Sequence, residues 1–346
     1  MLTELRFKNW RSLRDVTISN LTPITVFIGA NSSGKTNILE SLHFVRHALE
    51  KDPFQAVFAW GGYANLHSVF DEGSDPVNIE FLFATDAEKI SYHLDIQENI
   101  VIGGTESAGF GNGRSGESTL KSYVSRWQLL RENFLTPSVL SSNEDIGDLY
   151  VVDPLARNVP FMLNFMRQQP NSTPYEALQA DLAWLFSHIE RLDTVRNESE
   201  IRLLLREEVL QGKAAPTISG GTARLIAMLT AFYALDMKSA DLPGLVVIDE
   251  PDIGIHPLLL SRLVELLRVY TNPLNGHPRQ FILTTHNPMF LNLFQPEEVR
   301  IVERGEQGET TVQPVDMNVA NAWLDENGAY NLGDLWTTRL MGGIPE

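Results

Sequence analysis

The sequence has no cysteine among its 346 residues. A disulfide framework and a metal site built from thiolates are therefore excluded, and the composition fits a reducing compartment. No apolar run approaches the ~18 residues that a membrane helix requires. The opening Met1–Phe7 also lacks the basic start and apolar stretch of a signal peptide. These absences predict a soluble, cytoplasmic protein without membrane contact.

Positive charge is also scarce, because 27 lysines and arginines stand against 44 acids, a net charge of −17. This balance argues against a protein that coats DNA through bulk charge, since phosphate neutralisation dominates such binding. A local basic groove stays open as an alternative. Six cations interleave with acids in one stretch, a pattern that favours a solvated helix face: Arg191, Arg196, Arg202, Arg206, Lys213 and Arg224.

Apolar segments predict strands near both ends of the chain, with a long insertion between them. The expected strands are 2–9, 16–19, 24–28, 77–83, 90–96, 243–249 and 280–285, and the expected helices flanking them are 35–49 and 257–270. This order indicates an α/β domain formed by residues 1–100 and 211–346. Apolar spacing predicts that the inserted residues 101–210 are mainly helical. Six glycines within 103–118 predict a mobile loop there.

The segment from Gly29 to Thr36 reads GANSSGKT and matches the phosphate-binding loop G-x-x-x-x-G-K-[ST] at every fixed position. It follows an apolar strand and opens a helix, as this motif requires. Gly29 and Gly34 allow the backbone N–H groups to converge on phosphate oxygens. Lys35 is expected to bind the β- and γ-phosphates, and the Thr36 hydroxyl to bind Mg²⁺. The sequence therefore predicts an ATP site.

Two acids, Asp249 and Glu250, end a second buried strand. Ligands gather at the carboxyl ends of parallel strands, so Asp249 is expected to hold Mg²⁺. Glu250 is placed to polarise an attacking water as general base. A solvated turn explains one acid after a strand more easily than it explains the pair. A third strand ends in His286, a position at which a lone histidine is more often structural than functional.

A second turn, Ile218-Ser219-Gly220-Gly221-Thr222, precedes another helix. Its backbone N–H groups and serine hydroxyl form an anion-binding helix N-terminus. An ordinary loop explains any Gly-Gly pair, but a monomer needs only one such site for each nucleotide. The alternative is that Ser219, Gly220 and Gly221 cap the γ-phosphate of a nucleotide held by another subunit.

The order GANSSGKT, ISGGT, LVVIDEP, DIGIHP, TTHNP resembles the Walker A, signature, Walker B, D-loop and H-loop series of ABC-type ATPases. The opening NWRSL at 9–13 is similar to the start of SMC, RecF and OLD-like ATPases. The segment DEPDIGIHP and the ending YNLGDLW at 330–336 resemble small RecF-like ATPases of the AAA group. The resemblance covers about 1–90 and 215–346. It implies a P-loop NTPase of ABC/RecF type with an inserted subdomain.

The resemblance also implies a role for each matching residue. Arg11 would contact nucleotide phosphate near the adenosine side. His286 would sense the γ-phosphate, and Glu250 would be the base. Thr36 and Asp249 would bind Mg²⁺, and the Ser219–Gly221 turn would act in trans within an ATP-bound homodimer. The remaining residues would cradle phosphates: Gly29, Asn31, Ser32, Ser33, Gly34, Lys35, Thr36 and Asn37.

Several features depart from these families. The signature reads SGGT in place of SGGQ, and Gln55 is the one glutamine between the loop helix and the first hairpin. The 183 positions from Thr36 to Ser219 are too few for an SMC coiled coil. No acidic Toprim cluster follows His286, so the nuclease of OLD proteins is expected to be missing.

Three functions follow from the resemblance. The first is a dimeric ATP switch that works with a separately encoded effector, such as a nuclease, in DNA repair or anti-phage defence. The second is a RecF-like ATPase that clamps DNA itself, which a salt-dependent binding assay would separate from the first. The third, the cassette of a membrane transporter, is disfavoured by the opening strands, the IHP segment and the length of the insertion.

Overall fold

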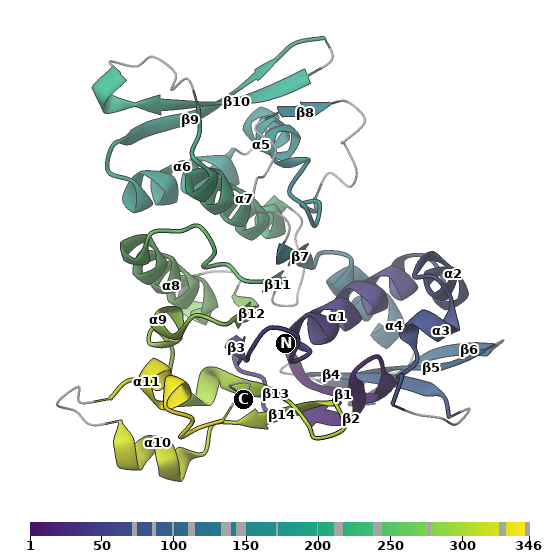
Figure 1. Cartoon of the computed structure of the whole chain (residues 1–346). Coiled ribbons are helices and arrows are strands. Elements are labelled where there is room, and N and C mark those ends of the chain that lie inside the picture. Colours follow the sequence, from purple (N-terminus) through teal and green to yellow (C-terminus); the bar gives the residue numbers. More distant parts are fainter. Residues whose placement is uncertain are drawn as a thin grey trace. The chain divides into compact units, whose positions relative to one another are not determined.

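The structure is a computed structural model that describes residues 1–70, 75–84, 88–98, 100–109, 115–132, 140–142, 150–170, 172–198, 200–210, 217–237, 244–275, 278–324 and 330–342. The chain forms two compact units (Figure 1). Unit 1 joins Met1–Ser125 to Gln280–Glu346, and unit 2 is Arg126–Arg279. The α/β character agrees with the sequence. The division differs from the expected one, because 101–125 joins unit 1 and 211–279 joins unit 2.

One sheet of unit 1 is antiparallel, with the strand order β2-β1-β4-β5-β6. Alternate residues of β4 are buried, as expected for a strand with one face on the core. The predicted early strands and the hairpin are confirmed. The strands are β1 (Leu2–Trp10), β2 (Leu13–Ile18), β4 (Val77–Ala84), β5 (Glu88–Gln97) and β6 (Ile100–Gly109).

The other strands of unit 1 have the order β14-β13-β3-β12. They are β3 (Ile24–Ile28), β12 (Arg279–Thr285), β13 (Val299–Arg304) and β14 (Thr310–Pro314). β3 lies between β12 and β13 and is parallel to both, whereas β14 pairs antiparallel with β13. Every residue of β3 is buried, which explains why its sequence is apolar apart from Thr25.

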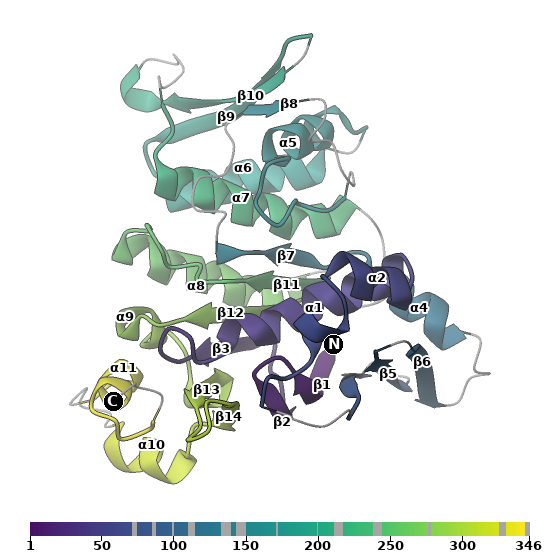
Figure 2. The ribbon, with the colours of Figure 1, turned by 45° about the vertical axis from the view of Figure 1, so that its right-hand side comes forward.

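The helices of unit 1 include α1 (Lys35–Glu50), which runs on from the turn after β3 (Figure 2). Trp10 of β1, Phe44 of α1 and Trp60 after α2 form an aromatic cluster with ring centroids 5.1 to 6.5 Å apart. This cluster holds the loop helix against the opening strand. The other helices are α2 (Pro53–Ala59), α3 (Tyr63–Leu66), α4 (Ser115–Val124), α9 (Pro288–Leu291), α10 (Met317–Trp323) and α11 (Leu332–Thr337).

In unit 2, α7 (Gly220–Ala234) is buried from Ala223 onward, consistent with its apolar sequence on all sides. α7 packs against α5 (Val159–Gln168) and α6 (Thr173–Leu185), and α6 also contacts α8 (Pro257–Thr271). β7 (Gln128–Leu130) and β11 (Gly244–Ile248) pair in parallel. A second, antiparallel sheet packs on α5 and α6, with β8 (Leu140–Ser142), β9 (Ile189–Arg196) and β10 (Glu200–Glu207).

Two expectations for the insertion need correction. Residues 201–210 were expected to be helical, but β10 occupies most of them, because Ile201, Leu203 and Leu205 bury one face at a period of two. The expected glycine-rich loop at 103–118 falls mostly in β6 and α4, and the rest of it, 110–114, lies outside the described residues. In the described part of the chain, none of the helices combines the length and apolarity needed to cross a bilayer.

Candidate nucleotide-binding site

The predicted phosphate-binding loop connects β3 to α1 within unit 1. Gly34 has φ +107°, a conformation that glycine adopts most easily. A Cβ at Gly29 would overlap the Val302 carbonyl oxygen and lie 2.7 Å from Ser33 Oγ, so the loop has no room for a side chain there. Lys35 is buried, and its Nζ donates to the carbonyl oxygens of Gly29 at 2.7 Å and Ala30 at 2.9 Å. The turn therefore curls as the motif predicts.

Residues distant in sequence brace this loop. Thr310 of β14 donates from Oγ1 to the Ser33 carbonyl oxygen at 2.8 Å. The same Oγ1 lies 2.7 Å from Ser12 Oγ, which accepts a hydrogen bond from Asn37 Nδ2 at 2.6 Å. Trp10 Nε1 donates to the Asn37 carbonyl oxygen at 2.9 Å. Through these hydrogen bonds the NWRSL segment supports the phosphate-binding loop. The motif match did not specify this role.

Arg11 lies beside the loop helix. Its guanidinium forms an ion pair with Glu40 of α1 and lies 5.5 Å from the ring centroids of both Trp10 and Trp60. Cation–π contact and the ion pair hold the side chain in place. The geometry gives Arg11 a clear structural anchor, and its contact with nucleotide remains a prediction.

His286 follows β12 at the point where the neighbouring strand β3 passes into the loop. Thr285 is paired with Ile28, so His286 and Gly29 come next on adjacent parallel strands. The His286 side chain is exposed. The adjoining helix α9 is held by the C-terminal segment, because the Gly333 N–H donates to Asn292 Oδ1 at 2.6 Å. A Cβ at Gly333 would overlap the Pro288 carbonyl, so this glycine permits the close approach of α11 to α9.

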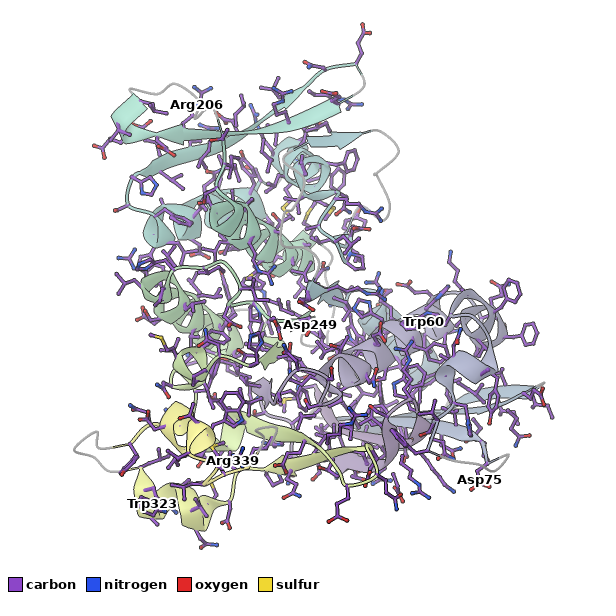
Figure 3. All side chains as sticks on the ribbon, in the orientation of Figure 1. Trp60, Asp75, Arg206, Asp249, Trp323 and Arg339 are labelled. Carbon is purple, nitrogen blue, oxygen red and sulfur yellow. The ribbon has the colours of Figure 1, made fainter. Side chains whose placement is uncertain are left out.

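The predicted acidic pair lies at the end of β11 in unit 2, where Figure 3 labels Asp249. Asp249 and Glu250 are 6% and 8% exposed. Glu250 has φ +50°, a left-handed conformation that costs about 1–3 kcal/mol for a residue other than glycine and that clusters at functional sites. The turn that follows is closed by N–H donation from Ile253 to the Glu250 carbonyl and from Ile255 to the Asp252 carbonyl.

The serine-glycine-glycine turn begins α7 in the same unit. Ser219 is the N-cap residue, and its Oγ accepts the Thr222 N–H at 3.2 Å. Ser219 and Gly220 are exposed, in contrast to the body of the helix. A Cβ at Gly221 would lie 2.6 Å from the Gly254 carbonyl oxygen, so α7 starts directly against the turn after Glu250.

Arg224 was expected on a solvated helix face, and this expectation is wrong. Its side chain is 1% exposed and donates to the Glu250 carbonyl oxygen at 2.5 Å. Burial lowers the pKa of Arg224 to about 10, against the opposing attraction of nearby acids, of which Asp252 is the strongest. The guanidinium therefore stays charged at neutral pH. No periodic pattern marked this residue, because α7 is apolar on every side.

The structure groups the predicted residues in two sets. Unit 1 brings together the loop, its bracing residues and His286. Unit 2 brings together the acidic pair and the Ser219–Gly221 turn.

The residues of the loop fit a bound triphosphate. Ser33 Oγ is buried and has no hydrogen-bond partner among the described residues. The curled backbone, the ammonium of Lys35 and the helix N-terminus form a concentration of donors suited to phosphate oxygens. Thr36 is exposed at the first turn of α1, where its hydroxyl is available as an oxygen ligand. Oxygen donors of this kind are those that Mg²⁺ prefers.

Family comparisons match two segments of the chain. Residues 1–125 match the model described as AAA ATPase domain. Residues 180–292 match the model described as AAA domain, putative AbiEii toxin, Type IV TA system. The first match contains the phosphate-binding loop, and the second contains the signature turn, the acidic pair and His286.

Curated relatives extend this picture. The Septu protein PtuA of Bacillus mycoides (strain KBAB4) is 24% identical over 99% of this chain, which spans 45% of that protein. The OLD nuclease of Thermus scotoductus is 21% identical over 98% of the chain and 69% of its own length. The DNA replication and repair protein RecF of Acinetobacter baylyi is 46% identical over 44 residues, 13% of this chain and 12% of its own. These matches confirm the resemblance to RecF- and OLD-like AAA ATPases.

Proposed function

We propose that this protein binds and hydrolyses ATP with Mg²⁺ and acts as a dimeric switch. The observation that carries the proposal is the loop in unit 1, where Lys35 lies over a turn that admits no side chain at Gly29. The match of residues 1–125 to an ATPase domain supports the same chemistry.

In this proposal the Lys35 ammonium and the N–H groups from Asn31 to Asn37 bind the β- and γ-phosphates. Thr36 and Asp249 hold Mg²⁺, which when bound neutralises phosphate charge. Glu250 accepts a proton from the water whose oxygen attacks the γ-phosphorus, while ADP leaves. His286, next to the loop in the strand order, donates to the γ-phosphate.

The dimer is proposed from the second anion-binding turn. Ser219 and Gly220 are exposed at the start of a helix that is otherwise buried, so this end of α7 is available to meet another subunit. In a head-to-tail arrangement, each Ser219–Gly221 turn closes on the nucleotide held by the other chain. Each of the two sites is then composite, and hydrolysis requires both chains.

Two variants test the ATPase assignment. Lys35→Ala removes the charge that faces the phosphates and should abolish nucleotide binding in a fluorescent ATP titration. Glu250→Gln keeps the phosphate contacts and should bind ATP but lose turnover by a factor of about 10²–10⁴. Equal ATP binding by wild type and Lys35→Ala would overturn the assignment, provided that circular dichroism shows both to be folded.

A separately encoded effector completes the proposal. The similarity to proteins named OLD nuclease and DNA replication and repair protein RecF supports a role connected with DNA. We therefore propose that ATP-dependent dimerisation controls a nuclease-type effector in DNA repair or anti-phage defence.

Direct DNA clamping is the second candidate, and one surface favours it. Arg202 and Arg206 of β10 point to the face of the sheet opposite to the buried Ile201, Leu203 and Leu205, and Figure 3 labels Arg206 there. Arg191 of β9 is paired with Arg206 and lies on the same face. If these arginines bind duplex DNA, the logarithm of the binding constant should fall linearly with the logarithm of the salt concentration. Arg202→Gln should reduce the magnitude of that slope by about one. A salt-independent or undetectable affinity would remove this candidate.

A further inference from the structure

Arg224 lies where the signature helix meets the acidic turn, inside unit 2. Its Nη2 donates to the carbonyl oxygens of Glu250 at 2.5 Å and of Asp249 at 3.4 Å, and its Nη1 points to the Glu132 carbonyl at 3.5 Å. These acceptors are backbone carbonyl oxygens. Through these hydrogen bonds the side chain restrains the path of the backbone at the end of β11.

The segment that Arg224 holds has an unfavourable backbone conformation. Glu250 has φ +50° and is buried next to Pro251, and proline restricts the conformation of the residue before it. Such a conformation persists only where the surrounding structure determines it. The hydrogen bond from Arg224 to the carbonyl oxygen of Glu250 is a direct restraint on this residue, charge-assisted and shielded from water.

A second contact joins the same two segments. Gly221 packs so closely on Gly254 that any side chain at Gly221 would press on the Gly254 carbonyl. Ser219 and Arg224 are on the same helix, five positions apart, with the first exposed at its start and the second buried against the acidic turn. These two contacts therefore link the exposed start of α7 to the acidic turn and to the backbone of Glu250.

We infer that Arg224 is a positioning residue that fixes the backbone of Glu250 and couples it to the Ser219–Gly221 turn. The inference rests on the proposed function, in which Glu250 is the general base and the turn meets the partner's nucleotide. Arg224 does not touch ATP. It sets the place of the carboxylate that acts on water, so its loss should lower kcat more than nucleotide affinity.

The test compares three full-length variants. Arg224→Met removes every donor while keeping an unbranched side chain, and Arg224→Lys keeps the charge but has a single nitrogen to share among the carbonyls. Arg126→Met is the matched control, because Arg126 is also buried in unit 2 and donates to a backbone carbonyl, that of Leu235, 2.9 Å away and remote from Glu250 in sequence. Circular dichroism and thermal melting report folding for each.

We expect kcat of Arg224→Met to fall between about 10-fold and 100-fold, as for a catalytic group displaced by about 1 Å. The Kd for a fluorescent ATP analogue should change by less than about twofold, since Lys35 provides that binding. Arg224→Lys should recover part of kcat, and Arg126→Met should keep the wild-type kcat per folded molecule. Wild-type turnover by Arg224→Met, or equal losses in Arg224→Met and Arg126→Met, would overturn the inference.

Hydrogen exchange provides a readout that does not need turnover. Amides of residues 249–256 should exchange faster in Arg224→Met than in wild type or Arg126→Met, because the local opening of this turn is restrained by Arg224. Unchanged exchange there contradicts the inference. If wild type fails to hydrolyse ATP, the proposed function is wrong, and the exchange result still decides whether Arg224 holds the turn. If Arg224→Met does not fold, Arg224→Lys is compared in its place, with a smaller increase expected.

Discussion

At the residue scale, Thr310 shows how a side chain from the far end of the sequence shapes the phosphate-binding loop. It is buried, and its Oγ1 links the Ser33 carbonyl oxygen to Ser12 Oγ. A Cβ at Gly34 would overlap this hydroxyl, so Thr310 also explains why a glycine is required at that position. The phosphate-binding loop and the opening NWRSL segment therefore both contact one atom of β14, the Oγ1 of Thr310.

We expect Thr310→Val to weaken ATP binding by at least about fivefold, since it keeps the volume but removes both hydrogen bonds of the hydroxyl, each worth roughly 1 kcal/mol to the support of the loop. Thr311→Val is the matched control, because the next residue of the strand points to the opposite face. Nucleotide titration and thermal melting of both variants check this. Equal affinities for the two variants would show that the Thr310 hydroxyl does not support the loop.

At the element scale, the β9–β10 hairpin is stabilised by an ion pair between its strands as well as by backbone hydrogen bonds. Asp193 of β9 accepts hydrogen bonds from Arg206 of β10 at 2.7 Å and from Arg191 at 2.9 Å. Burial works to raise the pKa of Asp193, but the hydrogen bonds and charges of Arg206 and Arg191 outweigh it, and the pKa lies below its usual value. The two arginines therefore favour the ionised carboxylate in the folded state.

A depressed carboxyl pKa stabilises the fold above the unfolded pKa of about 3.9, and this stabilisation is lost as the pH falls through the lower, folded value. Between about pH 5 and 7, Asp193→Asn should therefore have a lower urea midpoint of unfolding than wild type. This difference between the two midpoints should disappear below about pH 4. Glu190→Gln, an exposed change on the same strand, is the control. A difference in urea midpoint that stays constant down to acid pH would exclude this role for the ion pair.

At the scale of the whole molecule, the proposed head-to-tail dimer makes an unusual prediction for mixed variants. Ser219→Arg should abolish turnover by blocking the partner's nucleotide, while leaving ATP binding by its own loop unchanged. Mixed with Lys35→Ala, it forms heterodimers with one site that carries both defects and one that carries neither. Turnover should therefore partly return on mixing, measured as phosphate release at increasing ratios of the two chains.

Two outcomes would count against the composite sites. Full activity of Ser219→Arg alone would mean that the turn meets no phosphate. A mixture that stays inactive while heterodimers form, as shown by two affinity tags, would mean that the sites are not shared or that both must act together.

The sequence by itself determined the phosphate-binding loop and the strands around it. A strand, a tight turn and a helix are encoded in consecutive residues, so Gly29 to Thr36 identify the geometry without knowledge of the rest of the chain. The same locality explains why β3, β11 and β12 were predicted: each is buried on both faces and therefore carries a run of mostly apolar residues. Only the tertiary structure decided the nature of β10. Its run Leu203-Leu204-Leu205 satisfies a helix and a strand equally well, and pairing with β9 selects the strand.

The supporting residues of the site likewise depended on the tertiary structure. Thr310 and Ser12 are almost 300 positions apart, and nothing local to either indicates that their hydroxyls meet. In the sequence, Arg224 is one cation among several in its stretch. Its burial follows from the packing of α7 on the acidic turn. A motif that binds its ligand with consecutive backbone atoms is local, and it can be recognised in a sequence. The side chains that hold such motifs in place come from any part of the chain, because packing joins residues by distance in space and not by order along the backbone.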